Sequence, residues 1–248
     1  MRRIIILAAA IIAALAGVYP ASADVKRVTS AFLYEGRTVR VEFYRPNDNV
    51  ARPAALVLHG ASGLGRGWFV YPFAKAMAER GMAAAVVHYY DGLGKRSRKA
   101  SPRIFRTRDR ILKRAIDFVL AQPHVLDDGL GIYGMSLGGF HALSLGTQDD
   151  RVRAVVSLGG GLSRHIPERE AGRLPPTLLL HGDRDRVVPL KRALSVSRAM
   201  ETYGAPGEIK IYRGEGHSLS QRAHADAIRS TSDFLVSILL SRNLASAQ

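Results

Sequence analysis

Apolar residues in this chain gather in short runs, and most runs have the length and composition of β-strands. Several are apolar at nearly every position and rich in Val, Ile, Leu or Ala. The predicted strands are residues 38–44, 54–58, 83–87, 130–133, 152–157, 176–180 and 208–212. Strands that are apolar on both faces are typical of a parallel sheet covered by helices.

Segments with helical spacing of apolar residues lie between these strands. The predicted helices are residues 71–79, 103–121, 137–146, 189–202 and 222–240. Alternation of strand and helix predicts an α/β fold with a mainly parallel central sheet, and Glu35-Gly36 predicts an antiparallel hairpin before it. The stretch 164–175 is too short for a large cap domain, so we expect a fairly open pocket.

The N-terminus differs from the rest of the chain. Arg2 and Arg3 precede an uncharged apolar run over residues 4–18, and Ala21-Ser22-Ala23 follows. This pattern predicts a signal peptide over residues 1–23, cleaved after Ala23, rather than a permanent membrane anchor. The 248-residue chain is then one domain over residues 24–248, exported to the periplasm or the extracellular space. It has no Cys, which excludes disulfides and thiolate catalysis.

A candidate nucleophile lies where the predicted strand 130–133 meets the following helix. The sequence there is Gly134-Met135-Ser136-Leu137-Gly138-Gly139. A serine on such a sharp turn needs small neighbours, because side chains at the flanking glycines would collide with backbone. The motif is short, so its place between strand and helix carries the argument for Ser136.

Candidate acids and a candidate base follow two later strands. The loop after residues 176–180 holds Asp183 and Asp185, and either carboxylate could orient a histidine. The loop after residues 208–212 holds His217 between glycine and the last helix. The order Ser, Asp, His is the one expected of an α/β-hydrolase sheet.

The loop after the strand 54–58 could supply part of an oxyanion hole. It reads His59-Gly60-Ala61-Ser62-Gly63, and the expected donors are the backbone N–H groups of Ala61 and Leu137. Ser62 is interpreted as a turn residue. Tyr89, Tyr90 and Asp91 follow another strand end and are candidates either for the pocket or for core and turn positions.

Over residues 30–240 the sequence resembles the dienelactone hydrolase-like branch of the α/β-hydrolases. Besides the serine motif, the resemblance rests on His59-Gly60, on His181-Gly182 with Asp185 and Val188-Pro189, and on Gly216-His217. It implies that Asp185, rather than Asp183, is the acid. Founding members of this family use Cys as nucleophile, whereas this chain has Ser136 at that place.

These residues predict a serine hydrolase that cleaves a small or medium carboxylic ester through an acyl-enzyme. A peptidase or acyltransferase with the same triad, and a non-catalytic envelope-binding protein, are the alternatives. We expect no cofactor, because His59, His141 and His181 have no metal-ligand spacing and the Gly-rich stretch 158–162 lacks a nucleotide-binding Lys.

The chain is strongly basic, with a formal net charge of +15. We expect a small-molecule substrate and no nucleic-acid partner, and this charge would attract an anionic substrate. Lys95, Arg96, Arg98 and Lys99 could rim the pocket or simply be solvated. Arg110, Lys113 and Arg114 are predicted to form the solvated face of a helix.

Overall fold

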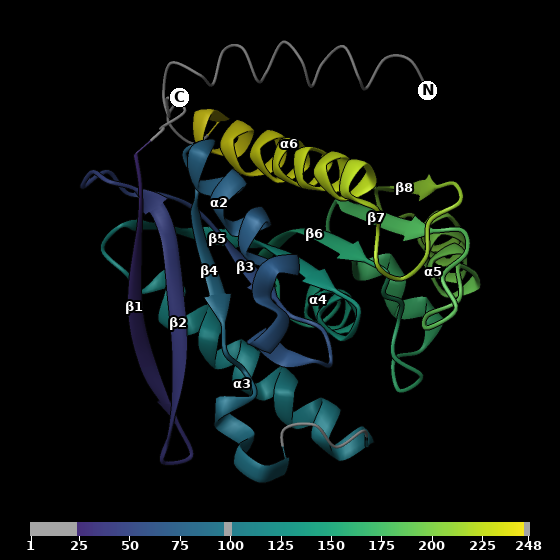
Figure 1. Cartoon of the computed structure of the whole chain (residues 1–248), viewed down its shortest axis with the longest axis horizontal. Coiled ribbons are helices and arrows are strands. Elements are labelled where there is room, and N and C mark those ends of the chain that lie inside the picture. Colours follow the sequence, from purple (N-terminus) through teal and green to yellow (C-terminus); the bar gives the residue numbers. More distant parts are fainter. Residues whose placement is uncertain (1–23, 97–100, 246–248) are drawn as a thin grey trace.

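The computed structural model describes residues 24–96 and 101–245, with the backbone alone for 66–68, 95–96 and 241–245 (Figure 1). The predicted signal peptide over residues 1–23 lies outside these residues. The sheet has the strand order β1-β2-β4-β3-β5-β6-β7-β8. The strands are β1 Val25–Tyr34, β2 Arg37–Pro46, β3 Arg52–Leu58, β4 Ala83–Val87, β5 Val125–Met135, β6 Val152–Leu158, β7 Thr177–Gly182 and β8 Gly207–Tyr212.

Strand β2 pairs antiparallel with β1 and β4, and all the other pairs are parallel. The predicted α/β-hydrolase fold with a mainly parallel sheet is therefore confirmed. Parallel strands place their C-terminal ends on one edge of the sheet, so the loops after β3, β4, β5, β7 and β8 come together there.

Helices cover both faces of the sheet (Figure 1). They are α2 Tyr71–Glu79, α3 Pro102–Leu120, α4 Leu137–Gly146, α5 Lys191–Tyr203 and α6 Gln221–Ala245, with short 3₁₀ helices η1 Gly63–Phe69, η2 Asp91–Arg96 and η3 Glu168–Arg173. Helices α3, α4 and α5 pack on one face, and α2 and α6 pack on the other. Within the described ranges, no helix has the length and apolarity that crossing a membrane requires.

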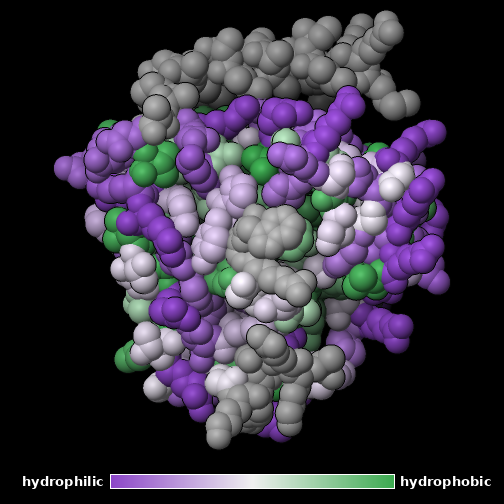
Figure 2. Space-filling view, viewed as in Figure 1, coloured by the Kyte–Doolittle hydropathy of each residue, from purple (hydrophilic) through white to green (hydrophobic). Residues whose placement is uncertain are grey.

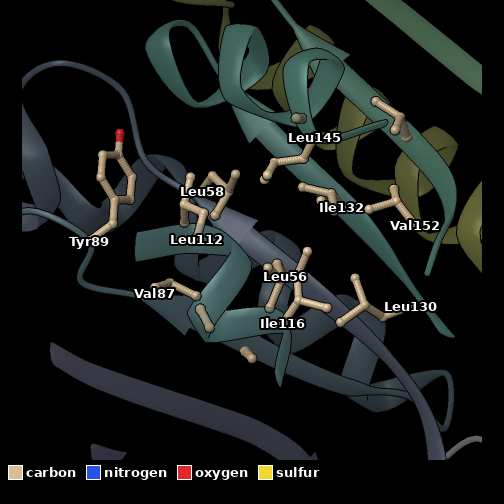
Figure 3. Close-up of a cluster of buried hydrophobic side chains, with 14 of the residues drawn as sticks. Leu56, Leu58, Val87, Tyr89, Leu112, Ile116, Leu130, Ile132, Leu145 and Val152 are labelled. Carbon is tan, nitrogen blue, oxygen red and sulfur yellow. The ribbon is translucent and has the colours of Figure 1, made fainter. Parts of the chain in front are cut away.

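The sheet separates two apolar layers, which explains why its central strands are apolar at every position. Strand β3 directs Leu56 and Leu58 toward α3, where they meet Leu112 and Ile116 (Figure 3). Its alternate residue, Val57, belongs to the layer under α2 and α6. Hydrophilic side chains dominate the outer surface in the view of Figure 2, as the charged composition predicts.

The edge of the sheet differs most from the sequence prediction. The hairpin at Glu35-Gly36 is present, and both residues have positive φ, 47° and 73°. However, β1 reaches back to Val25, a strand that the sequence pattern did not delimit. Most β1 side chains are not buried, so the strand has no apolar run to reveal it. Strand β5 likewise begins at Val125, before the predicted residue 130.

Helix α3 begins where its sequence predicts. Pro102 occupies the first turn, and the Ser101 hydroxyl accepts a hydrogen bond from the Ile104 N–H at 3.2 Å. A stripe that includes Ile111 and Ala115 is fully buried against the sheet.

Candidate active site

Ser136 stands on a strained turn between β5 and α4. Its φ of 54° lies in the left-handed region that non-glycine residues rarely adopt. The turn is tight enough that a Cβ at Gly134 would overlap the Gly138 backbone, and a Cβ at Gly138 would overlap the Leu58 and His59 carbonyls. The glycines therefore permit the close approach that exposes the serine hydroxyl at the sheet edge.

His217 and Asp185 approach this serine from two other loops. The Nε2 atom of His217 lies 2.9 Å from Ser136 Oγ, and its Nδ1 atom lies 2.7 Å from Asp185 Oδ2. The Asp185 side chain is only 1% exposed, and that of His217 is 17% exposed. The structure thus brings the three predicted residues together from the loops after β5, β7 and β8.

The bonds of Asp185 determine which nitrogen of His217 can act as an acceptor. Asp185 Oδ1 accepts the N–H groups of Val187 and Val188, each at 2.8 Å, so Oδ2 is left for His217. A carboxylate only accepts, so His217 Nδ1 carries a proton, and in the neutral ring Nε2 is a bare acceptor facing Ser136. Asp183 instead accepts the Gly214 N–H at 2.7 Å, away from the imidazole.

Two residues that the sequence reasoning did not select for the site lie beside this carboxylate–imidazole pair. His181 donates from Nε2 to the Val188 carbonyl at 2.8 Å, and burial lowers its pKa, which favours the neutral ring. Gly159 has φ 61°, and a Cβ there would lie 3.4 Å from His217 Cε1 and 3.6 Å from Asp185 Oδ2. The Gly-rich stretch after β6 was the available signal for Gly159.

The two candidate oxyanion donors flank the serine. Leu137 opens α4 directly after Ser136, so its N–H belongs to the unsatisfied first turn of the helix. Ala61 shares with Ser136 and His217 the wall of a cavity of about 250 Å³. A Cβ at Gly60 would lie 3.3 Å from Ser136 Cβ, so the loop after β3 passes immediately beside Ser136.

The three candidate residues after β4 lie in two environments, one in the core and two in the wall of a cavity. Tyr89 is fully buried, and its hydroxyl donates to the His59 carbonyl at 2.7 Å. Tyr90 and Asp91 line a neighbouring cavity of about 710 Å³ whose wall shares His59, Ser62 and Gly63 with the Ser136 cavity. Asp91 pairs there with Arg40 at 2.8 Å.

The basic segment lies only partly within the described residues. The predicted rim lies outside the described residues, which exclude Arg98, Lys99 and the side chains of Lys95 and Arg96. Arg110 and Arg114 are exposed, as predicted for the solvated face of the helix, and Lys113 is half-buried. Arg110 and Lys113 also line a cavity between α3 and α4. In the described part of the chain, no group of three His, Asp or Glu side chains could hold a metal ion.

Sequence comparison identifies relatives over most of the domain. The profile of the dienelactone hydrolase family matches residues 39–234. An uncharacterized 31.7 kDa Escherichia coli protein from the traX-finO intergenic region is 28% identical over 131 residues, which is 53% of this chain and 44% of that protein. The match therefore spans less than half the length of this curated relative.

Solved structures with this architecture include hydrolases of several kinds. A dienelactone hydrolase-like promiscuous phosphotriesterase from metagenomic libraries superimposes with a TM-score of 0.74 at 18% identity, covering 87% of this chain and 99% of the other. A puromycin-hydrolyzing peptidase of Mycobacterium tuberculosis has a TM-score of 0.72 at 19% identity, covering 87% of this chain and 39% of the peptidase. Since the family profile covers most of the chain and the fold agrees, the protein belongs to the dienelactone hydrolase family of α/β-hydrolases.

Proposed function

We propose that the protein is a serine hydrolase that cleaves carboxylic esters of small or medium size, with Ser136 as nucleophile, His217 as base and Asp185 as acid. The observation that carries the proposal is the continuous hydrogen-bonded chain from Ser136 Oγ through the imidazole to Asp185 Oδ2. Membership of a hydrolase family supports the same reaction class.

The geometry supports a two-step acyl transfer. His217 Nε2 accepts the Ser136 proton as Oγ attacks the ester carbonyl carbon, and Asp185 stabilises the resulting imidazolium. The N–H groups of Ala61 and Leu137 donate to the carbonyl oxygen as it becomes negative. When the tetrahedral intermediate collapses, His217 returns the proton to the leaving alkoxide, and the acyl group stays on Ser136.

Hydrolysis of the acyl-enzyme repeats these steps with water as the nucleophile. His217 accepts a proton from water, the hydroxide attacks the acyl carbon, and Ser136 Oγ leaves with the proton that His217 donates. A cavity of about 250 Å³ leaves space for a small acyl group, and it lies partly open to solvent, since Val187 on its wall is 69% exposed.

The test is covalent labelling combined with one substitution. A fluorophosphonate probe should label Ser136 of the folded wild-type protein, and Ser136→Ala should abolish labelling and lower kcat by about 10⁴ to 10⁶. Circular dichroism and thermal unfolding should show that the variant keeps its fold. Labelling elsewhere, or a tenth of the activity remaining in Ser136→Ala, would remove Ser136 from the reaction.

A peptidase is the second candidate, because one protein with this fold is a puromycin-hydrolyzing peptidase. The triad acts on amides and esters alike, so only substrate comparison separates the two activities. We expect p-nitrophenyl esters of short acyl chains to be turned over much faster than matched peptide anilides. The opposite preference would make the protein a peptidase.

We also propose that the enzyme is exported after removal of residues 1–23. The support is the sequence pattern alone, with Arg2 and Arg3 before an apolar run and small residues before Asp24. N-terminal sequencing of protein from the cell envelope or medium should begin at Asp24. A protein in that fraction that begins at Met1 would indicate an anchor.

A further inference from the structure

Three consecutive carbonyls in the loop beside Ser136 each accept a hydrogen bond from an aromatic side chain. We name the segment His59-Gly60-Ala61 the oxyanion loop. The Tyr89 hydroxyl donates to His59 O at 2.7 Å, and the Tyr90 hydroxyl donates to Ala61 O at 3.0 Å. Between them, His59 Nδ1 lies 2.8 Å from Gly60 O, and it must be the donor because a carbonyl can only accept.

These contacts determine where the Ala61 N–H points. The Gly60 carbonyl and the Ala61 N–H belong to one planar trans peptide, so they point in opposite directions. Gly60 O is held from one side by His59 Nδ1 and also by the Gly63 N–H at 3.0 Å. The peptides before and after it are held by Tyr89 and Tyr90, so the peptide that carries the Ala61 N–H has little freedom to rotate.

The aromatic rings are themselves fixed by packing. The His59 ring stacks on Tyr89 with centroids 4.0 Å apart, and Tyr90 meets His59 edge-on at 4.7 Å. Arg108 lies over the Tyr90 ring at 5.2 Å. Burial lowers the pKa of His59 to about 4, so its ring is neutral and uncharged near pH 7.

We propose that Tyr90, with Tyr89 and His59, is a positioning residue that aims the Ala61 N–H at the developing oxyanion. The proposal rests on the proposed serine hydrolase function. Loss of an oxyanion donor costs about 10² to 10³ in kcat, and loss of one hydrogen bond that aligns the donor should cost less.

Tyr90→Phe tests the proposal because it removes one hydroxyl and keeps the ring. We expect kcat for p-nitrophenyl butyrate to fall about tenfold, with KM changed less than twofold, because alignment matters most in the transition state. Tyr89→Phe should act in the same direction, and thermal unfolding will show whether this buried variant is folded. Tyr203→Phe, at a half-exposed tyrosine on α5, is the matched control and should leave kcat unchanged.

A second measurement separates positioning from general disturbance. A trifluoromethyl ketone adds to the serine and places an oxyanion where the two N–H groups point. Across wild type, Tyr90→Phe and Tyr89→Phe, its inhibition constant should rise in proportion to the fall in kcat/KM. Unchanged kcat in Tyr90→Phe, or reduced kcat with an unchanged inhibition constant, overturns the positioning role. Failure of the fluorophosphonate probe to label Ser136 of the wild-type protein would instead overturn the proposed serine hydrolase function.

A different observation concerns the cavity of about 260 Å³ between α3 and α4, which we name the α3–α4 cavity. Arg106, Arg110 and Lys113 of α3 line it, at a spacing that puts them on one helix face. Within the described residues none of these three cations forms an ion pair, and the Arg110 guanidinium donates hydrogen bonds to the hydroxyls of Tyr34 and Thr107. Arg114, on the same helix, does pair with Asp117.

The floor of the α3–α4 cavity is a fixed polar network. Asp109 accepts hydrogen bonds from His141 Nδ1 at 2.7 Å and from Ser144 Oγ at 2.8 Å, so both of its oxygens are engaged. Gln148 donates to Ser144 Oγ at 2.9 Å and faces the same cavity. With Asp109 buried and bonded beneath, the accessible walls carry an excess of positive charge.

We infer that the α3–α4 cavity binds a phosphate-type oxyanion. Two guanidinium groups and one ammonium group suit a tetrahedral anion with several acceptor oxygens, and a bound anion would relieve the repulsion among three like charges on one helix face. The ligand could be free phosphate or the phosphate of a lipid headgroup, since both present the same oxygens.

Calorimetric titration with inorganic phosphate, at constant ionic strength maintained with chloride, tests this site. We expect saturable binding that weakens at least tenfold in the double variant Arg106→Gln/Lys113→Gln. Arg198→Gln/Lys191→Gln on α5 removes the same charge elsewhere and should change binding little. Sedimentation with phosphatidylglycerol vesicles, with and without phosphate as competitor, separates the two sources. No saturable binding to either, or equal weakening in both double variants, overturns the site.

Discussion

At the scale of single residues, Asp183 and Asp185 show how position within one loop decides what a carboxylate does. Both follow β7, yet Asp185 is buried against His217, whereas Asp183 binds the Gly214 N–H at the surface. The two backbone N–H groups on Asp185 Oδ1 leave only its other oxygen for the imidazole. Substituting each aspartate in turn therefore tests which carboxylate orients His217, with the other variant as its matched control.

Asp185→Asn should lower kcat by about 10⁴, because an amide can donate to Nδ1 and favour the wrong tautomer of His217. Asp183→Asn should lower kcat less than tenfold, since it weakens only a loop contact. Steady-state kinetics on one p-nitrophenyl ester measures both. Equal losses in the two variants would contradict the assignment of the acid.

At the scale of elements, runs of apolar or alternating residues predicted most strands closely, whereas the first strand, β1, was not delimited. Strands β3 and β4 are buried at every position, so their apolar runs predicted them within two residues. Strand β1 lies at the sheet edge with few buried side chains, and its pattern gave no comparable signal. Strand β1 is held by backbone pairing with β2, which the side-chain pattern does not report.

In the candidate site, too, some residues were predictable from motifs and others depend on how the elements pack. Ser136, His217 and the two aspartates were predictable because glycine motifs follow strands in the expected order. The partners of the Tyr89 and Tyr90 hydroxyls depend on the register between β3 and β4, which sets Val57 beside Val86. The polar face of α3 was also predictable, but the helical period does not reveal that α4 stands next to Arg110 and Lys113.

The hairpin between β1 and β2 contains a correctable local strain. Glu35 has φ 47° and is exposed, and an asparagine tolerates this left-handed conformation better, particularly before glycine. Glu35→Asn should therefore stabilise the protein by about 0.5 kcal/mol, or raise Tm by about 2 °C. Differential scanning calorimetry measures the change, with Glu35→Ala as a control that should show no increase. A lower Tm for Glu35→Asn would mean that the glutamate side chain contributes more than the strain costs.

At the scale of the whole molecule, buried histidines link folding to pH. His59, His141 and His181 are each no more than 2% exposed, and burial lowers the pKa of all three. For His59 the pKa falls from 6.5 to about 4, so between these values the unfolded chain binds a proton that the folded protein does not. Folding stability contributed in this way is present above the unfolded pKa and is lost as pH falls.

We expect the free energy of unfolding to decrease between pH 7 and pH 5. Each fully buried histidine contributes a slope of at most about 1.4 kcal/mol per pH unit inside its window. Urea denaturation at pH 7, 6 and 5 measures the slope, which should be smaller in His181→Asn and unchanged in the exposed-site control His165→Gln. A free energy of unfolding that is constant across this range would show that these histidines do not drive acid sensitivity.

The residues of the hydrogen-bonded chain come from distant parts of the sequence: Ser136 and His217 are 81 positions apart, and Asp185 and His217 are 32 positions apart. Their loops lie together because β6, β7 and β8 extend the sheet from β5 in parallel register. Such non-local pairing forms slowly compared with local helices. During refolding, the circular dichroism signal of the helices should therefore return before ester hydrolysis does. Hydrolytic activity should appear only when all the strands of the sheet have paired.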